Sequence, residues 1–309
     1  PEVAKKSGAK IFITMHDAKA VHQGKFTDFI NPHDLSIPKR INYKISHWKL
    51  FTTFKRRYNP FKNMVIRYYL QYADKIFAVS NALKQVLNDN HINNVEVIHN
   101  GINIPDKDFS AEEISDFKEK YDLVDKKIIS FAGWVNGAKG GDQILMALEK
   151  VTKKNPNVVL LAVGRTGLYY VSMRELAIKR GLSDKVVFTG WLSGKELRLS
   201  YSCSDVVTFP SVCLDTFGMV NLEGMISKKP VIATCFGGAP EIVENGVTGY
   251  IVNPFNVDMM SDKIVTLLNN SELAKNMGVN GANRVKNLFN IRIISEQYYQ
   301  YYKIFRKSK

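Results

Sequence analysis

Two acidic residues, Asp215 and Glu223, flank the predicted start of a helix near Gly218 and have seven residues between them. The first amides of that helix, from Phe217 to Met219, are free donors at the positive end of a helix dipole and can bind a phosphate group. The carboxylate of Glu223 can accept two hydrogen bonds from the vicinal hydroxyls of a ribose. The residues therefore allow a site for a phosphorylated ribose ligand, and they equally allow a solvent-facing glutamate and an aspartate in a turn.

The stretch from residue 203 to residue 249 has to position this helix start. It follows the pattern strand, loop, helix, strand, glycine turn, short helix and strand, with an apolar strand on each side of the two acids. This pattern predicts a parallel sheet, and ligands of parallel sheets bind where strands end and helices begin. We expect Thr216 to cap the helix and Gly218 to let a ligand approach the backbone closely.

The same alternation of strands and helices extends along most of the chain. Short apolar strands are predicted at residues 10–14, 75–79, 95–98, 127–132, 158–163, 186–189 and 206–209, with helices between most of them. Strands that alternate with helices at this spacing predict βαβ units and parallel sheets. The predicted fold is therefore α/β, with two facing, doubly wound Rossmann-like domains.

Shifts in composition place the domain limits. We assign residues 1–104 to the first domain and residues 105–288 to the second, because a polar, acidic connector occupies residues 105–125. Residues 289–309 are predicted to form a packing helix that can return to the first domain, since apolar and aromatic residues recur at helical spacing from Ile294 to Phe305. The first residues, from Pro1 to Lys6, resemble the middle of a helix, so we expect an N-terminal segment to be missing.

The composition fits a globular protein with anionic partners. Of the 309 residues, 45% are hydrophobic and 23% are charged, and the formal net charge is +14. No apolar run approaches the roughly 18 residues that span a bilayer, and no signal peptide is recognisable at this end. The three cysteines, Cys203, Cys213 and Cys235, lack the paired spacing of a zinc site. We expect them to be buried and reduced, which favours a cytoplasmic location.

Much of the positive charge lies in one segment, residues 38–69. No acidic residue occurs from Leu35 to Ala73. The basic residues there are Lys39, Arg40, Lys44, Lys49, Lys55, Arg56, Arg57, Lys62 and Arg67, interleaved with Tyr43, Trp48, Phe51, Phe54, Tyr58, Phe61, Tyr68 and Tyr69. We predict helices that are broken at Pro60. A solvated surface and contact with an anionic membrane both fit this composition, whereas no nucleic-acid motif accompanies it.

An ordered set of motifs resembles the retaining glycosyltransferases of family 4, which have the GT-B fold. The motifs are Pro210-Ser211, Asp215-x-Phe217-Gly218, Glu223-Gly224-Met225, Lys229-Pro230-Val231-Ile232-Ala233, Gly237-Gly238-x-Pro240-Glu241 and Thr248-Gly249, preceded by His16-Asp17, Ala73-Asp74 with Ser80, Val97-Ile98-His99-Asn100-Gly101, Gly133 with Lys139-Gly140, and Ser204-Asp205. The resemblance covers nearly the whole chain.

This resemblance implies the transfer of a sugar from a nucleotide-diphosphate sugar, with retention of the anomeric configuration and without a bound metal or another cofactor. It implies that the second domain binds the donor and the first domain a glycan or lipid-linked acceptor. A lipid-linked or cell-envelope acceptor would also explain residues 38–69, so we favour a cytoplasmic protein that contacts the membrane face peripherally. We expect no nucleic-acid partner.

The resemblance also assigns roles to single residues. It implies that Asp215 contacts the donor sugar and that Glu223 holds the ribose. The amides from Phe217 to Met219, with Gly218 between them, match the phosphate and sugar contacts. Lys139, which follows Gly133, matches the lysine that neutralises the diphosphate, and His16 matches the histidine that faces the sugar. A lysine and helix-end amides are suited to this reaction because negative charge develops on the departing diphosphate.

The chain departs from the pattern of the family at three places. Asp215 stands where the family usually has a glutamate, and Trp134 where it usually has an arginine. Arg165, after the next strand, is the nearest basic residue that could compensate. The first strand and glycine-rich loop of the family have no counterpart before Pro1. Alternatives are therefore a degenerate or truncated member that binds a nucleotide sugar or a partner without turnover, and an epimerase or phosphorylase of the same fold.

Three further motifs have structural interpretations. Asp106-Lys107-Asp108 resembles a metal-binding motif, but it lies in the polar connector and is expected to be solvated. His99, before an Asn-Gly turn, is expected to be structural. Glu241 could touch a ligand, or it could cap its own short helix.

Overall fold

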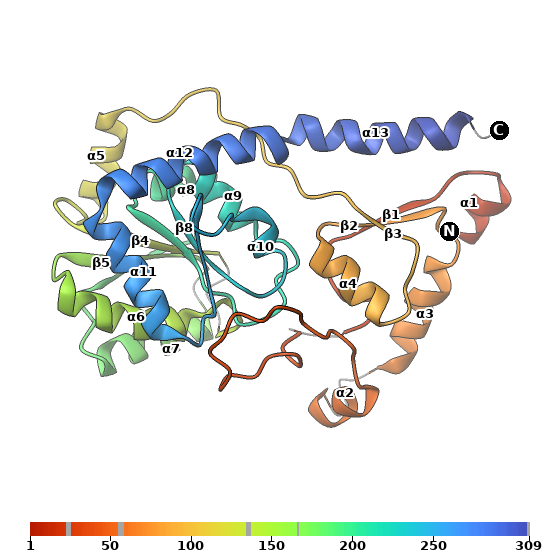
Figure 1. The fold of residues 1–309 in the computed structure, drawn as a ribbon, viewed down its shortest axis with the longest axis horizontal. Helices are drawn as coiled ribbons and strands as arrows, with labels where there is room; N and C mark the ends of the chain where they lie inside the picture. The colour runs from red at the N-terminus through yellow and green to blue at the C-terminus, as the bar shows by residue number, and fades with distance from the viewer. Residues whose placement is uncertain (23–25, 55–58, 134–136, 166, 308–309) are drawn as a thin grey trace.

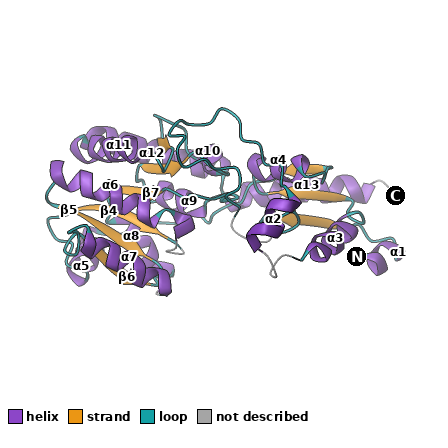
Figure 2. Ribbon diagram, turned by 90° about the horizontal axis from the view of Figure 1, so that it is seen from below, coloured by secondary structure: helices purple, strands orange, loops and turns teal. Residues whose placement is uncertain are grey.

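The computed structural model describes residues 1–307 except 23–25, 55–58, 134–136 and 166. It contains a three-stranded sheet in the order β1-β2-β3 and a six-stranded sheet in the order β6-β5-β4-β7-β8-β9. Figures 1 and 2 show the two sheets as separate layers, each with its own helices, placed side by side. The predicted fold class, an α/β protein with two doubly wound, Rossmann-like units, is confirmed.

The strands match the apolar runs of the sequence, and all of their pairings are parallel. Their bounds are β1 Phe12–Met15, β2 Lys75–Ala78, β3 Val95–Val97, β4 Lys127–Ala132, β5 Val158–Val163, β6 Val186–Gly190, β7 Val206–Phe209, β8 Val231–Thr234 and β9 Gly249–Val252. Every residue of β5, β7 and β8 is buried. Uninterrupted apolar runs of this kind form strands that are covered on both faces of a sheet.

Helices cover both faces of the six-stranded sheet. They are α6 Gly141–Lys154, α7 Leu168–Lys179, α8 Gly194–Ser202, α9 Met219–Ile226, α10 Ala239–Ile242, α11 Val257–Asn269 and α12 Ser271–Leu288. Successive residues of β4 face opposite layers of helices. Ile129 packs in the cluster with α6, α7 and α11, whereas Ile128 packs in the cluster with α8, α9 and α12. This alternation follows from the period of two of a strand.

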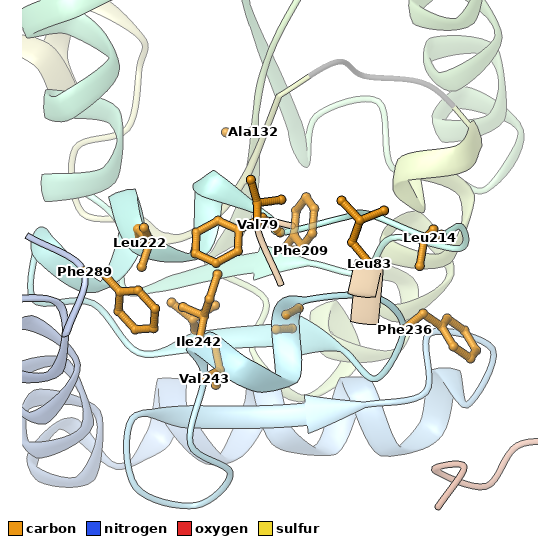
Figure 3. Packing of buried hydrophobic residues seen from close by; sticks show 14 of the residues in the cluster. Val79, Leu83, Ala132, Phe209, Leu214, Leu222, Phe236, Ile242, Val243 and Phe289 are labelled. Atoms are coloured by element: carbon orange, nitrogen blue, oxygen red, sulfur yellow. The ribbon is translucent and has the colours of Figure 1, made fainter. Parts of the chain in front are cut away.

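The second of these clusters continues into the unit of the three-stranded sheet. It contains Val79, which follows β2, and Leu83 of α4 (Asn81–Asp89), together with Leu214 and Phe236 of the other unit. Figure 3 shows these four side chains among the buried residues of this cluster. The two units are therefore held together by buried apolar contact.

The two covalent connections between the units lie against each other. The chain passes from β3 to β4 through Ile102, whose amide donates to the Phe289 carbonyl at 2.8 Å, and it returns from α12 to α13 (Ile291–Lys307), where the Ile291 amide donates to the Ile102 carbonyl at 3.0 Å. A Cβ atom on Gly101 would lie 2.7 Å from the Cα atom of Ile291. Only a glycine allows this close approach.

After this crossing, α13 packs on the three-stranded sheet. Tyr298 and Tyr301 contact the ring of Phe77 edge-on, with centroid separations of 5.2 and 5.0 Å. Figure 1 shows α12 and α13 running one after the other along both units. The assigned limits at residues 104 and 288 themselves stay a prediction.

The predicted break at Pro60 is confirmed, and the predicted connector contains a helix that was not among the predicted elements. Helices α2 (His47–Phe54) and α3 (Pro60–Leu70) are separate, and Pro60 occupies the first turn of α3, as expected of a helix-starting proline. The connector at residues 105–125, however, contains the helix α5 (Ala111–Lys120). A reciprocal capping box between Ser110 and Glu113 stabilises its start. Ile114, Phe117 and Tyr121 recur at helical spacing and pack on the core, with Phe117 fully buried.

Candidate functional site

Helix α9 begins at a glycine that the backbone requires. Gly218 is its N-cap residue, with φ 89° and ψ 63°, a left-handed conformation that residues with a side chain rarely adopt. The prediction that Thr216 caps this helix is wrong, because no side chain caps it. The hydroxyl of Thr216 instead donates to the carbonyl of His16 at 2.7 Å. The first amides of α9 are thus left open to another acceptor.

Lys139 and Asp215 form an ion pair beside this helix start. Lys139 ends a short 3-10 helix (Gly137–Lys139) that follows β4, whereas Asp215 follows β7. Their side chains are only 18% and 15% exposed, and the ammonium also lies 5.3 Å from the ring centroid of Phe209. The amide of Phe217 donates to the second carboxylate oxygen at 3.3 Å. The Asp215 carboxylate thus lies between the Lys139 ammonium and the Phe217 amide, so the Phe217 amide is not free, and the open amides are those of Met219 and Val220.

The loop that carries Lys139 is held against the loop after β7. The Ser211 hydroxyl and the Val212 amide both donate to the carbonyl of Ala138, at 3.1 and 3.0 Å. Gly140 has φ 83°, and a Cβ atom there would lie 1.9 Å from the carbonyl oxygen of Pro210. Because the strands β4 and β7 are neighbours, these contacts bring Lys139 to Asp215 although 76 positions separate them in the chain.

Glu223 lies in the second turn of α9 and is mostly buried. The hydroxyl of Tyr201, on α8, donates to its Oε2 atom at 2.7 Å. Burial raises the pKa of Glu223 above its ordinary value, and the hydrogen bond from Tyr201 offsets part of this shift. The alternative of a solvent-facing glutamate is therefore wrong, and the sequence analysis missed Tyr201 as its partner.

His16 follows β1 and approaches the site from the other unit. Its side chain is exposed and lines a cavity of about 570 Å³ together with Met219 of α9, His99 and Tyr298 of α13. The bond from Thr216 to its carbonyl ties it to the loop of Asp215. The structure thus brings His16 and Met219 to one cavity, which Lys139, Asp215 and Glu223 do not line.

The remaining predicted residues lie at the ends of β4 and β5. Gly133 has φ 123°, and its amide donates to the Val163 carbonyl at 2.9 Å. Arg165 is exposed, and its guanidinium lies 5.1 Å from the ring centroid of Trp191. Its compensation for a missing arginine stays a prediction, and Trp134, at the position of that arginine, lies outside the described residues.

Glu241 has a role that both sequence interpretations missed. Its carboxylate accepts the amides of Asn81 and Ala82 at 2.8 and 2.9 Å, at the start of α4 in the other unit, and lies 3.0 Å from Nε2 of His99. It therefore caps α4 and not its own helix α10. Burial by itself raises the pKa of Glu241, but the hydrogen bonds from His99, Asn81 and Ala82 outweigh it, so the pKa lies below its ordinary value.

The described residues contain neither a metal-binding cluster nor a membrane-spanning helix. No group of three or more His, Cys, Asp or Glu side chains in that part of the chain could hold a metal ion. Asp108 instead pairs with Lys228. Within the same residues, no helix is long and apolar enough to cross a membrane. The three cysteines are buried and unpaired.

The strand order of the six-stranded sheet and the polar groups at its edge define a class of protein. The order reverses between β4 and β7, and Lys139, Asp215 and the start of α9 all follow these two strands. In open parallel sheets, nucleotides bind at such a reversal. The fold and site are those of a two-unit, doubly wound α/β protein with polar groups at the strand-order reversal.

Comparison with known proteins identifies the family. The family model described as Glycosyl transferases group 1 matches residues 113–284, and that described as Glycosyltransferase Family 4 matches residues 3–105. The chain therefore belongs to the group 1 glycosyl transferases. An uncharacterized glycosyltransferase of Methanocaldococcus jannaschii is 33% identical over 70% of this chain and 56% of its own length.

Two further similarities place the chain beside characterised proteins. The GDP-mannose-dependent alpha-(1-6)-phosphatidylinositol monomannoside mannosyltransferase of Mycolicibacterium smegmatis is 31% identical over 57% of this chain and 47% of that protein. The crystal structure of HepE from Anabaena in complex with UDP superposes with a TM-score of 0.77 at 19% identity, over 98% of this chain and 74% of that one. This likeness confirms the GT-B fold. The chain spans about half the length of the curated relatives that it matches.

Proposed function

We propose that this chain transfers a sugar from a nucleotide-diphosphate sugar to a glycan or lipid-linked acceptor and retains the anomeric configuration of the sugar. The proposal is carried by one observation: Lys139, the open amides of α9 and the carboxylate of Glu223 share one edge of the sheet. The Anabaena neighbour holds UDP and the mycobacterial relative uses GDP-mannose, so the donor class agrees with both. The motifs that resemble retaining enzymes support retention.

In this proposal, the diphosphate of the donor lies between Lys139 and the first amides of α9. As the sugar–phosphate bond breaks, the leaving diphosphate gains negative charge. An ammonium and preorganised amides stabilise that charge where it develops. Lys139 then turns partly from Asp215 to the phosphate. The Asp215 carboxylate becomes free to accept a hydrogen bond from a hydroxyl of the donor sugar.

The other proposed roles follow from position. Glu223 accepts hydrogen bonds from the ribose hydroxyls. His16 faces the sugar from the opposite unit, beside Met219. Gly133 leaves room at the end of β4, and Arg165 supplies a second positive charge after β5. The transfer needs no metal or other cofactor in this proposal, since the positive charge comes from the protein.

Calorimetric titration with UDP, GDP and ADP, and with their sugar forms, tests the donor site. We expect one of the three bases to bind, and Glu223→Ala to weaken that binding by about tenfold or more, because hydrogen bonds to a charged group contribute about 1.5–3 kcal/mol. Glu244→Ala, at an exposed glutamate of the same unit, is the matched control. Equal binding by Glu223→Ala and the wild-type protein would contradict the proposed donor site.

A second candidate function is binding of a nucleotide sugar without turnover. The observation that favours it is the pairing of Lys139 with Asp215, a residue one methylene shorter than the usual glutamate. Incubation with the donor that binds, followed by NMR of any product, separates the two functions. A glycoside with the anomeric configuration of the donor supports retaining transfer, and binding with no product supports the second candidate.

We further propose that the surface of α2 and α3 contacts an anionic membrane. On α3 the side chains of Phe61, Met64, Val65, Tyr68 and Tyr69 are all exposed, at the spacing of one helical stripe, and on α2 Trp48 and Phe51 are exposed as well. Figure 1 shows α2 and α3 close together. Residues 55–58 of this basic segment lie outside the described residues.

The charge of this surface decides between its possible partners. No acidic residue occurs from residue 35 to residue 73, so a surface of acidic lipid head groups is complementary to it. We expect the protein to float with vesicles that contain phosphatidylglycerol and not with pure phosphatidylcholine. Lys62→Glu should weaken this binding by about 30-fold, because the reversal changes the charge by two units and each charge near the surface contributes about 1 kcal/mol.

Val65→Ser should also reduce flotation, whereas Val171→Ser, at an exposed valine of α7, serves as the control for loss of apolar surface elsewhere. Flotation that is indifferent to lipid charge, or absent with both lipids, would contradict the membrane proposal.

A further inference from the structure

Tyr201 is a buried residue outside the set of predicted site residues, and its one polar group points at the site. It lies at the end of α8 and is 1% exposed. Its hydroxyl donates to Oε2 of Glu223 at 2.7 Å. A buried tyrosine hydroxyl needs a polar partner, and here the partner is the carboxylate to which ribose binding is assigned.

The backbone that carries Glu223 is fixed by close packing on two sides. A Cβ atom on Gly224 would lie 3.0 Å from the side chain of Val207 in β7, and a Cβ atom on Gly281 of α12 would lie 3.2 Å from Met225. Helix α9 therefore packs closely against both the sheet and α12. Since the main chain is fixed, the direction of the Glu223 carboxylate depends on its side-chain torsions, which the bond from Tyr201 restrains.

The hydrogen bond from Tyr201 also makes the two oxygens of the Glu223 carboxylate different. Oε2 accepts from Tyr201, whereas Oε1 has no hydrogen bond to any described residue. A carboxylate oxygen keeps further lone pairs after one hydrogen bond, so a ribose diol can still bind to both oxygens. Oε1 is not among the buried side-chain atoms of the described residues that lack a partner, so it stays accessible to a ligand that donates to it.

We propose that Tyr201 is a positioning residue that aims the Glu223 carboxylate at the ribose hydroxyls and so makes the site select ribonucleotides over deoxyribonucleotides. This inference rests on the proposed function, in which Glu223 holds the ribose of the donor. Tyr201 itself touches no ligand; it acts through the carboxylate.

Titration of Tyr201→Phe with a nucleoside diphosphate and with its 2′-deoxy counterpart tests the inference. The variant keeps the buried ring and removes only the hydroxyl. The base is the one of UDP, GDP and ADP that the wild-type protein binds. We expect the affinity for the ribonucleotide to fall about tenfold and the affinity for the deoxyribonucleotide to fall less, because only its 3′-hydroxyl can still donate to Glu223, so the ratio of the two affinities shrinks.

Two controls accompany this titration. Tyr169→Phe removes a hydroxyl that donates to the carboxylate of Asp142 at 2.6 Å in the same unit, and it should leave the ratio unchanged. In a Glu223→Gln background, Tyr201→Phe should change the ratio much less than in the wild-type protein, because the two residues act through one contact. Thermal unfolding of each variant confirms that it is folded.

Each outcome decides a different claim. An equal loss of affinity for both nucleotides, or no loss for either, overturns the role of Tyr201 and leaves the proposed function intact. Failure of the wild-type protein to bind all three nucleotides overturns the proposed function and this inference together.

Discussion

Replacement of Lys139 by alanine is expected to lower the rate of sugar transfer on the order of 10²–10³-fold, the usual cost of losing one preorganised donor to developing negative charge. Lys139 is only 18% exposed, so its charge acts in a poorly solvated site, where it has a larger effect than at the surface. Binding of the free nucleoside diphosphate should weaken as well, because the same ammonium contacts the ground-state phosphates. Initial rates with the donor that binds measure the effect.

The control for this substitution is Lys150→Ala. Lys150 pairs with Asp258 on the outside of the same unit and is 47% exposed, so its loss should leave the rate nearly unchanged. Because Lys139→Ala leaves Asp215 without its partner, Lys139→Arg is also needed. It keeps the ion pair, and it should fold normally and retain part of the activity. A rate for Lys139→Ala within twofold of the wild-type rate would contradict the proposed role.

Replacement of Glu241 by alanine is expected to lower the free energy of unfolding by about 3 kcal/mol, the range measured when one partner of a buried charged network is removed. The carboxylate satisfies two amides at the start of α4 and lies beside His99. Without it, these donors lose their acceptor and α4 loses a negative charge at its positive end. Urea unfolding at pH 7 measures the change.

The same residue predicts a dependence of stability on pH. The pKa of Glu241 in the folded protein lies below its ordinary value of 4.5, so the folded state favours the charged carboxylate. This stabilisation is fully present above the unfolded pKa and is lost as the pH falls toward the folded pKa. Glu241→Gln should therefore reduce the difference in stability between pH 7 and acid.

Glu244→Gln is the matched control, because Glu244 is 53% exposed and pairs with Arg284 at 3.4 Å. It should change the unfolding free energy by less than about 1 kcal/mol. An equal effect of the two glutamine variants would show that the contact between the units adds nothing to stability.

Local sequence was a good guide to the strands and a poor one to the contacts between them. The apolar runs at β4, β5 and β7 predict their strands to within a residue, because strands that are covered on both faces are mostly apolar. Helix α5 is harder to predict, because only Phe117 is fully buried and most of its other positions are polar or charged. Thr216 has the composition of a capping residue, but a tertiary contact with His16 uses its hydroxyl.

The candidate site shows the same division. The sequence places Lys139, Asp215 and Glu223 each at the end of a strand or the start of a helix, and ends of parallel strands meet at one edge of a sheet. It does not reveal that Lys139 pairs with Asp215, that Tyr201 binds Glu223, or that Glu241 caps a helix of the other unit. These contacts depend on the packing of distant segments, which no local pattern encodes.

The paired crossing at Ile102 and Phe289 determines how one unit can move against the other. Both covalent connections pass through it, joined by two backbone hydrogen bonds, so a rotation between the sheets has to turn about this single hinge. Gly101 and Ile291 of this crossing line the same cavity as His16, so a movement at the crossing also changes the shape of the cavity that His16 faces.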